Sequence, residues 1–217
     1  HEQTLVAPTM YYNLLSQTMR LAMADEISHP AFESLAATSL LKNSYEQFIG
    51  NENSPWWDDT KTEGRETRAQ IVEQAAKKTI SLLSAIGGRN PADWKWGKVH
   101  TLTHKHAFDA VKPLRSFFNV GPFEVPGGSE VLNNLHFSLD TTGYFHVDGG
   151  PALRKITDFA DMENGETVSP SGQSGNVMST HYSDQAVMYA TGQFRKMLMN
   201  REAIQSRGRK LILTPGS

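Results

Sequence analysis

The chain has 217 residues, which is long enough for one substantial core or two small ones, because a domain usually takes about 100 to 200 residues. Its formal net charge of -2 gives no electrostatic reason to expect nucleic acid or an anionic membrane surface as a partner. The chain has no cysteine, which excludes disulfides, thiolate metal sites and a cysteine nucleophile within it. No stretch approaches the roughly 18 to 20 apolar residues of a membrane span, and the N-terminus has no basic-then-apolar leader. We therefore expect no membrane partner.

The first 90 residues have a helical pattern. Apolar residues recur at steps of three and four from Thr9 onward, which predicts a first helix. A second helix is predicted from Phe32 to Ile49, and a third from about Thr62 to Ile86, ending at Gly87-Gly88. Residues 51–60, which include Pro55, are predicted to form the loop between them.

Beyond Asn90-Pro91 the sequence has short β-type runs separated by glycine and proline. The predicted strands are Glu130 to Leu139, Tyr144 to Val147, Leu153 to Phe159 and Lys210 to Leu213. One amphipathic helix is predicted at about Tyr182 to Met199. These patterns divide the chain into a helical segment, residues 1–90, and a strand-rich segment, residues 91–217, so the predicted fold class is α+β.

Three short blocks follow one another in the second segment. They are G-P-A-L-R-K-I-T-D at 150–158, G-Q-S-G-N at 172–176 and H-Y-S-D-Q at 181–185. In this order they resemble the C-terminal pattern of the penicillin amidase-type acylases, a family of N-terminal-nucleophile hydrolases. That family also has a Trp-Gly pair before a histidine cluster, which W-K-W-G-K-V-H at 94–100 and His104 resemble. The resemblance runs from about Asp93 to Met199.

The resemblance implies an αββα sandwich, to which residues 91–217 contribute antiparallel strands and an outer helix. Residues 1–90 then correspond to a helical insertion near the acyl pocket. The family's nucleophile is a Ser, Thr or Cys at the first position of the large subunit, whereas the first residue here is His1. Nothing before Trp94 matches the family's oxyanion-stabilising asparagine or its companion arginine. We expect the chain to be the C-terminal part of the large (β) subunit, a scaffold with no catalytic, cofactor-binding or metal-binding residues of its own.

The resemblance also implies what the parent protein does. Such an acylase hydrolyses the amide bond of N-acyl compounds such as penicillins and acyl-homoserine lactones, using an N-terminal serine. The expected partners are the rest of the precursor, meaning the small subunit and the N-terminal half of the large subunit, and a small N-acyl substrate. A periplasmic or secreted location is expected, and calcium, seen in some relatives, is a candidate ion of the complete enzyme.

His100, His104 and His106 suggest a different function. Two imidazoles four residues apart on a helix lie on one face and can share a zinc ion, which would make a metal-dependent hydrolase. The alternative is a set of hydrogen-bonded structural histidines. This alternative is favoured because the chain has no HExxH pattern, and Gly97 and Pro113 leave little room for a long helix.

A second possibility is a hydrolase triad, in which His181, Tyr182 and Asp184 supply two of the members and Ser174 or Ser179 the third. The glycine after Ser174 comes one residue too early for a nucleophile elbow, and residues adjacent at a helix start point in different directions. We therefore favour local roles for these residues. The glycines are expected to adopt positive φ, and Ser174 to bond within the loop. Ser179, Thr180 or Ser183 is expected to cap the helix that follows, with Asp184 in its first turn. Gln185 is expected to bond to a neighbouring loop.

Two further sets of residues are predicted to be structural. Arg154 and Asp158 are expected to form a buried ion pair, although such a pair can also bind a substrate carboxylate. Trp94 and Trp96 are expected to join the helical segment to the strand-rich segment, although indole rings can also stack on an aromatic ligand. The last alternative for the whole chain is a non-catalytic binding or assembly module of acylase ancestry.

Overall fold

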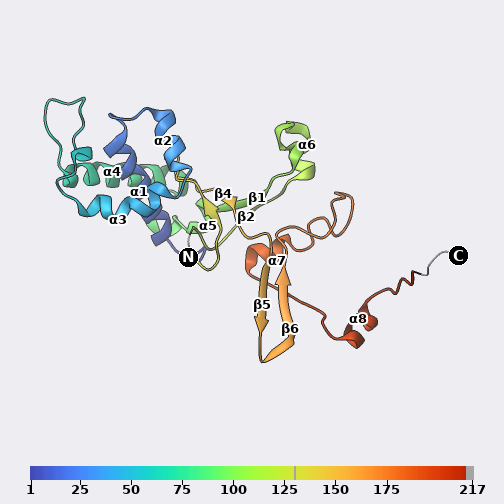
Figure 1. Cartoon of the computed structure of the whole chain (residues 1–217). Coiled ribbons are helices and arrows are strands. Elements are labelled where there is room, and N and C mark those ends of the chain that lie inside the picture. The colour runs from blue at the N-terminus through green and yellow to red at the C-terminus, as the bar shows by residue number, and fades with distance from the viewer. Residues whose placement is uncertain (130, 214–217) are drawn as a thin grey trace. The chain divides into compact units, whose positions relative to one another are not determined.

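The computed structural model describes residues 1–129 and 131–213, which form two compact units. Unit 1 contains His1–Thr103 and Gly121–Gly150, and unit 2 contains His104–Val120 and the described residues from Pro151 on. Both units combine helices with small sheets, so the predicted α+β class is confirmed (Figure 1). The predicted boundary at residue 90 falls inside unit 1. Among the described residues, no helix has the length and apolar character needed to cross a membrane.

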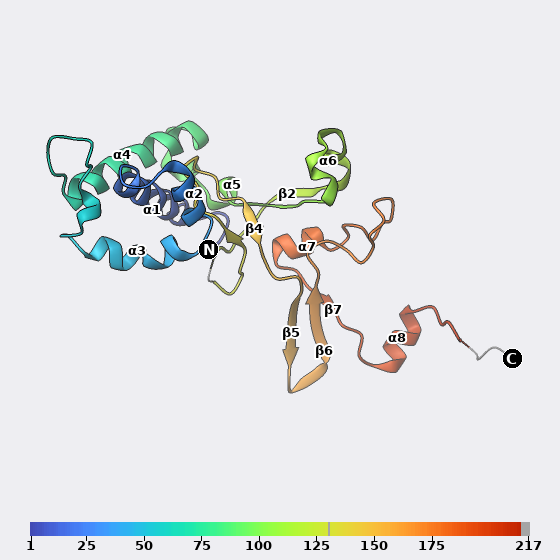
Figure 2. The ribbon, with the colours of Figure 1, turned by 45° about the horizontal axis from the view of Figure 1, so that its top comes forward.

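Unit 1 is mainly helical, with two small two-stranded sheets, β1-β2 and β3-β4. Its helices are α1 (Ala7–Met23), α2 (His29–Ala36), α3 (Leu40–Gly50), η1 (Pro55–Trp57), α4 (Arg68–Gly87), η2 (Pro91–Asp93) and α5 (Trp96–Val99). Its strands are β1 (Thr101–His104), β2 (Val120–Glu124), β3 (His136–Phe137) and β4 (Val147–Gly149), of which β1 and β2 each extend by one residue into unit 2. Helices α1 and α4 lie side by side in both views (Figures 1 and 2).

The helix ends follow from local chemistry. A capping box opens α4, in which the Thr67 hydroxyl accepts a hydrogen bond from the Gln70 N–H and the Gln70 side chain accepts one from the Thr67 N–H. Gly88 follows α4 with a φ of 82°, so the predicted stop at Gly87-Gly88 is confirmed. The single helix predicted over 32–49 is wrong. The Thr38 hydroxyl donates to the Leu35 carbonyl and accepts from the Leu40 N–H, and these bonds replace helical ones between α2 and α3.

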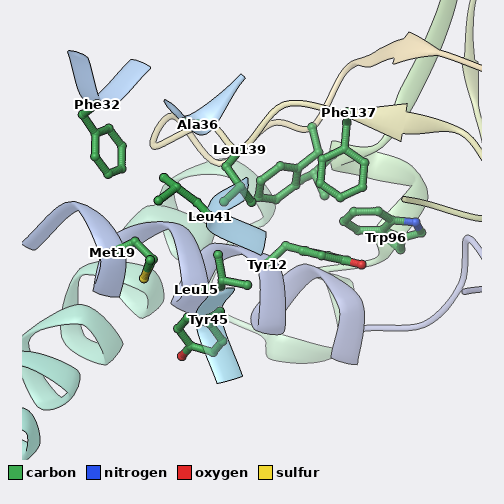
Figure 3. Packing of buried hydrophobic residues seen from close by; sticks show 12 residues of the cluster. Tyr12, Leu15, Met19, Phe32, Ala36, Leu41, Tyr45, Trp96, Phe137 and Leu139 are labelled. Carbon is green, nitrogen blue, oxygen red and sulfur yellow. The ribbon is translucent and has the colours of Figure 1, made fainter. Parts of the chain in front are cut away.

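The core of unit 1 is centred on Trp96, which is 0% exposed. Its indole stacks on His100 with ring centroids 4.5 Å apart and on Tyr12 of α1 at 5.4 Å, and its Nε1 donates to the Gly127 carbonyl. Phe137 of β3 meets the same ring edge-on (Figure 3). Trp96 therefore joins the helices to the strand-forming part of unit 1, as predicted.

The first residues of the chain are bonded to this core. The Trp96 N–H donates to the Leu5 carbonyl at 2.7 Å, and the Gly127 N–H donates to the His1 carbonyl at 2.6 Å. Gly127 has a φ of 87°, and a Cβ there would lie 2.2 Å from the Asn133 carbonyl oxygen. Only glycine fits this close turn, which carries the acceptor for the Trp96 indole.

Unit 2 is built around a three-stranded antiparallel sheet with strand order β5-β6-β7 (Figure 2). Its strands are β5 (Arg154–Asp158), β6 (Asp161–Val168) and β7 (Arg195–Lys196). Its helices are η3 (Ala107–Ala110), α6 (Lys112–Phe118), α7 (Ala186–Thr191) and α8 (Arg201–Arg207). Strand β5 matches the predicted strand at 153–159, whereas β6 and β7 were not predicted.

Several other predicted elements are shorter or absent. The strand expected at 130–139 is confined to β3, and its first residue, Glu130, lies outside the described residues. The strand expected at 144–147 is displaced to β4, and 210–213 is exposed coil with no strand partner among the described residues. The helix expected at 182–199 is reduced to α7, because Gly192 takes a left-handed φ of 72° and ends it.

Replacing Trp96 with Ala should lower the free energy of unfolding of unit 1 by roughly 3 to 5 kcal/mol, because a buried indole leaves a cavity that the surrounding rings cannot fill. Urea unfolding followed by far-ultraviolet circular dichroism measures this loss. Trp56→Ala is the matched control, since the Trp56 side chain is only partly buried. Equal losses in the two variants would contradict the central role of Trp96.

Candidate functional site

The G-Q-S-G-N and H-Y-S-D-Q blocks form two sides of one closed loop in unit 2. The Ser174 N–H donates to the His181 carbonyl at 3.0 Å, and the Gln185 N–H donates to the Ser171 carbonyl at 2.9 Å. Gly172 lies against the second block, where a Cβ would be 2.1 Å from the His181 carbonyl oxygen. The Tyr182 hydroxyl donates to the Phe118 carbonyl at the end of α6. The motif spacing therefore brings two backbone segments together and ties them to a neighbouring helix.

The loop does not form a serine hydrolase triad. The Ser174 hydroxyl accepts a local bond from the Asn176 N–H, while His181 Nδ1 lies 2.8 Å from Asp184 on the exposed side of the loop. The predicted local bond at Ser174 is confirmed. The predicted reason for the glycines is wrong, because neither Gly172 nor Gly175 has a positive φ, and Gly172 is required by close packing instead.

The predicted start of the following helix is also wrong. Helix α7 begins at Ala186, two residues after Asp184, so no acidic side chain lies in its first turn. Its N-cap is Gln185, which makes no side-chain cap bond, and not Ser179, Thr180 or Ser183. The Gln185 Oε1 instead accepts from the Ser169 N–H at 3.1 Å, which confirms the predicted bond to a neighbouring loop.

Residues from three of the sequence motifs gather around Tyr189 of α7. The Arg154 guanidinium lies 3.9 Å from the centroid of the Tyr189 ring, and its Nη1 donates to the Tyr189 carbonyl. The His104 ring meets the same ring edge-on at 6.0 Å. Gln185 precedes Tyr189 by one helical turn, with its carbonyl accepting from the Tyr189 N–H. We call His104, Arg154, Gln185 and Tyr189 the Tyr189 cluster.

Arg154 does not pair with Asp158, so the predicted ion pair is wrong. Arg154 lies over Tyr189, whereas the Asp158 Oδ1 accepts from the Ala160 N–H in the turn between β5 and β6. The register of β5 shifts between Ile156 and Asp158, which breaks the alternation that would have placed both side chains on one face.

The three candidate zinc ligands lie in different settings. His100 follows α5 and is fully buried, with Nδ1 3.0 Å from the Val125 carbonyl and Nε2 3.3 Å from the Leu135 carbonyl. Burial lowers the pKa of His100, although the bonds to the two carbonyls oppose this shift. His104 ends strand β1, and His106 caps η3 by accepting from the Phe108 N–H.

These positions do not support the single helix face that the metal hypothesis requires. His100 belongs to unit 1, whereas His104 and His106 belong to unit 2. In the part of the chain that the structure describes, no group of three or more His, Asp or Glu side chains could hold a metal ion.

A polar network in unit 1 was not found by sequence reasoning. The Lys42 ammonium of α3 donates to the Ser129 hydroxyl at 2.8 Å and to the Phe137 carbonyl at 2.6 Å. His136 Nδ1 lies 2.6 Å from Asp148, whose second oxygen accepts from the Ser138 hydroxyl. Because Ser138 bonds to the aspartate and not to the histidine, this is not a triad. The network joins α3 to the β3-β4 pair, whose antiparallel register brings residues 136 and 148 together from distant positions.

A cavity of about 340 Å³ lies beside this network in unit 1. The side chains that line it are mostly polar: Tyr11, Tyr12, Leu15, Lys42, Asn43, Glu46 and Ser129.

A carboxylate pair at the end of α1 has strongly altered acidity. Partial burial, a hydrogen bond to Asp25 and repulsion from that carboxylate raise the pKa of Glu26 from 4.5 to about 7, and Asp58 adds to the effect. Partial burial opposes ionisation of Asp25, but hydrogen bonds from Glu26 and from the Thr60 N–H and hydroxyl outweigh it and lower the Asp25 pKa. The two bonds from Thr60 to Asp25 hold the loop at Thr60 against the residues that follow α1.

The geometry defines an α+β structure in which the sequence motifs order loops. Neither the serine triad nor the histidine metal site considered as alternatives is assembled among the described residues. A family model described as penicillin amidase matches residues 1–206. The chain therefore belongs to the penicillin amidase family, in agreement with the resemblance drawn from its motifs.

Curated relatives of the chain carry the name acyl-homoserine lactone acylase QuiP. The chain is 26% identical to the protein of Pseudomonas syringae pv. syringae over 95% of its own length and 26% of the relative. It is 27% identical to that of Pseudomonas aeruginosa over 85% of its length and 24% of the relative. It is 28% identical to that of Pseudomonas fluorescens over 95% of its length and 25% of the relative. The chain thus spans about a quarter of the length of these relatives.

Replacing Gly172 with Ala should destabilise the motif loop by roughly 1 to 3 kcal/mol, because the added methyl group meets the His181 backbone and one segment must shift. Gly175→Ala in the same motif is the control, since nothing lies within 4 Å of a Cβ at that position. The rate of limited proteolysis within 172–185 reports the loosening. If both variants were cleaved at the wild-type rate, the close contact would have no structural importance.

Replacing Glu26 with Gln should change how stability depends on pH. The folded-state pKa of Glu26 is raised from 4.5 to about 7, so its contribution is present below pH 4.5 and is lost as the pH rises to about 7. The Gln variant should therefore match the wild type below pH 4.5 and be the more stable protein above pH 7. Urea unfolding across this range measures the difference, with the exposed Glu63→Gln as control. A difference between wild type and variant that does not change with pH would refute the raised pKa of Glu26.

Proposed function

We propose that this chain is the C-terminal part of the large subunit of an acylase and that it serves there as scaffold, without the nucleophile. The observation that carries the proposal is the family match over residues 1–206, combined with the structural use of all three motif blocks. The residues that looked most like catalytic groups, Ser174 and His181, bond locally within one loop. The chemistry of the parent protein is accordingly assigned to a serine at the start of its large subunit.

Exposed apolar side chains in unit 2 support a scaffold role. Strands β5 and β6 form a hairpin on which Ile156, Phe159 and Met162 are 51%, 87% and 55% exposed. The segment after α8 exposes Leu211, Ile212 and Leu213 in the same way. Large apolar side chains exposed to this degree often mark a surface that another part of a protein covers. We propose that the β5-β6-β7 sheet continues into an αββα sandwich completed by the rest of the large subunit and by the small subunit.

The parent enzyme is proposed to act on N-acyl compounds by acyl transfer. The serine hydroxyl attacks the amide carbonyl, its own α-amine takes the proton through a water molecule, and the amine product leaves before water hydrolyses the acyl-enzyme. Acyl-homoserine lactones are the substrates to test first, because the relatives are named for them. Penicillins and related amides form the second group. The proposed location is the periplasm or the cell exterior.

Calcium, where the parent enzyme binds it, is proposed to have its ligands outside this chain. Among the described residues no group of three or more carboxylates and histidines fits such an ion. Calcium requires six to eight oxygen ligands, with several carboxylates among them.

The proposal predicts the composition of the protein in its producing cells. Native mass spectrometry should find a particle well above 24.1 kDa in which the sequence of this chain lies within a subunit that begins with Ser. The same particle should release homoserine lactone from an N-acyl-homoserine lactone, and replacing that first Ser with Ala should abolish the release.

A folded particle of 24.1 kDa that contains this chain alone and cleaves no N-acyl substrate would overturn the proposal. That outcome would leave a non-catalytic assembly module of acylase ancestry as the better account.

A further inference from the structure

The segment between β1 and β2 in unit 2 exposes most of its large apolar side chains. It spans residues 105–119 and contains η3 and α6, neither of which has a buried residue. We call it the η3-α6 segment. Four of its apolar side chains are between 37% and 53% exposed: Phe108, Val111, Leu114 and Phe117. An exposed group of large apolar side chains is informative in a way that a single one is not.

The polar groups of the η3-α6 segment bond to one another. The Asn119 side chain accepts from the His106 N–H at 2.9 Å and donates to the Asp109 carboxylate at 2.6 Å. The Arg115 guanidinium donates to the Asp109 carbonyl and lies 3.0 Å from the Asp109 carboxylate. A helix as short as α6 is not stable alone in water. These bonds therefore maintain the shape of the segment while its apolar side chains stay exposed.

The exposed apolar side chains lie next to one another. Val111, Leu114 and Phe117 recur at steps of three residues, which places them along one side of α6. The Phe118 ring meets Phe117 at 5.1 Å and Phe108 at 5.2 Å, and so connects η3 to that side of α6. We call Phe108, Val111, Leu114 and Phe117 the apolar face.

Two exposed lysines flank the apolar face. Lys105 precedes η3, and Lys112 is the first residue of α6. No ion pair between described residues includes either of them. An apolar centre with a charged rim is the usual arrangement of a protein interface. The charges favour a partner that has carboxylates around its own apolar surface.

We propose that the apolar face packs against the part of the parent polypeptide outside this chain, on an apolar surface with acidic residues at its rim. The inference rests on the proposed function, in which this chain is one part of a larger acylase. The family match includes the whole η3-α6 segment, while the chain spans about a quarter of its relatives, so most of the parent is available to cover this face. The Tyr182 hydroxyl of the H-Y-S-D-Q block donates to the Phe118 carbonyl, so one of the motif blocks holds the segment in place.

The first test measures how accessible the apolar face is in the folded parent enzyme. A cysteine introduced into this chain can be followed by peptide mass spectrometry, because the chain has none of its own. Phe117→Cys should react with a maleimide roughly tenfold more slowly than Ser116→Cys, because only the first position lies on the covered face. Both should react equally fast in urea. Equal rates in the folded parent would overturn the inference.

Two other occupants are distinguished by the same measurement. Protection of Phe117→Cys that disappears when the enzyme is diluted would assign the apolar face to a second copy of the parent. Protection that requires phosphatidylglycerol vesicles would assign it to an anionic lipid surface. Either result would overturn the proposed partner.

Charge reversal tests the acidic rim. Lys112→Glu should lower the midpoint of thermal unfolding of the parent by a few degrees, because like charges then meet at the interface. The loss should shrink as salt is added. Lys78→Glu, an exposed position on α4, is the control and should change the midpoint little. An unchanged midpoint in Lys112→Glu would contradict the acidic rim.

The structure of the wild-type parent gives a test that does not depend on folding of the variants. It should place apolar side chains from outside this chain in contact with the Phe117 ring, and an exposed ring would refute the inference. Amide hydrolysis is measured separately. An active parent with an exposed Phe117 would refute the inference alone, and an inactive parent with a covered Phe117 would refute the proposed function alone.

Discussion

The packing of Trp96 is the interaction on which the rest of unit 1 depends. A single indole stacks on Tyr12 of α1 and on His100, meets Phe137 of β3, and donates its N–H to the carbonyl of Gly127. Residues more than 80 positions apart along the sequence are thereby held by one side chain. Because the buried donor must keep its acceptor, the tight turn at Gly127 is as strictly required as the ring itself.

Tyr189 is the central ring of a cluster in unit 2, as Trp96 is in unit 1, but the neighbours of Tyr189 include the charged side chain of Arg154. Burial raises the pKa of Tyr189, while the Arg154 guanidinium on its face opposes that shift. The tyrosine hydroxyl donates to the Pro151 carbonyl, so the ring is held at its polar end as well as on its face. A cluster of this kind positions β5 against α7.

The sequence predicted what depends on local chemistry. Helices α1 and α4, the stop at Gly88 and strand β5 were foreseen, since periodic apolar residues and glycine act within a few positions. The α2-α3 break was missed because it depends on which backbone groups the Thr38 hydroxyl bonds. The strand expected at 210–213 failed for another reason: apolar content favours a strand, but a strand also requires a neighbour to pair with.

The candidate site was predicted less well, because its contacts are long-range. The motif blocks could be listed from the sequence, but no spacing rule brings His104 to Tyr189, and the Lys42 network depends on the register between β3 and β4. The family resemblance was the stronger guide, since it marked His104, Arg154 and Gln185 without explaining them. Their geometry supplies an explanation. In this chain these motif residues order loops through local contacts, with Arg154 bonded to the Tyr189 carbonyl and Gln185 to the Ser169 N–H.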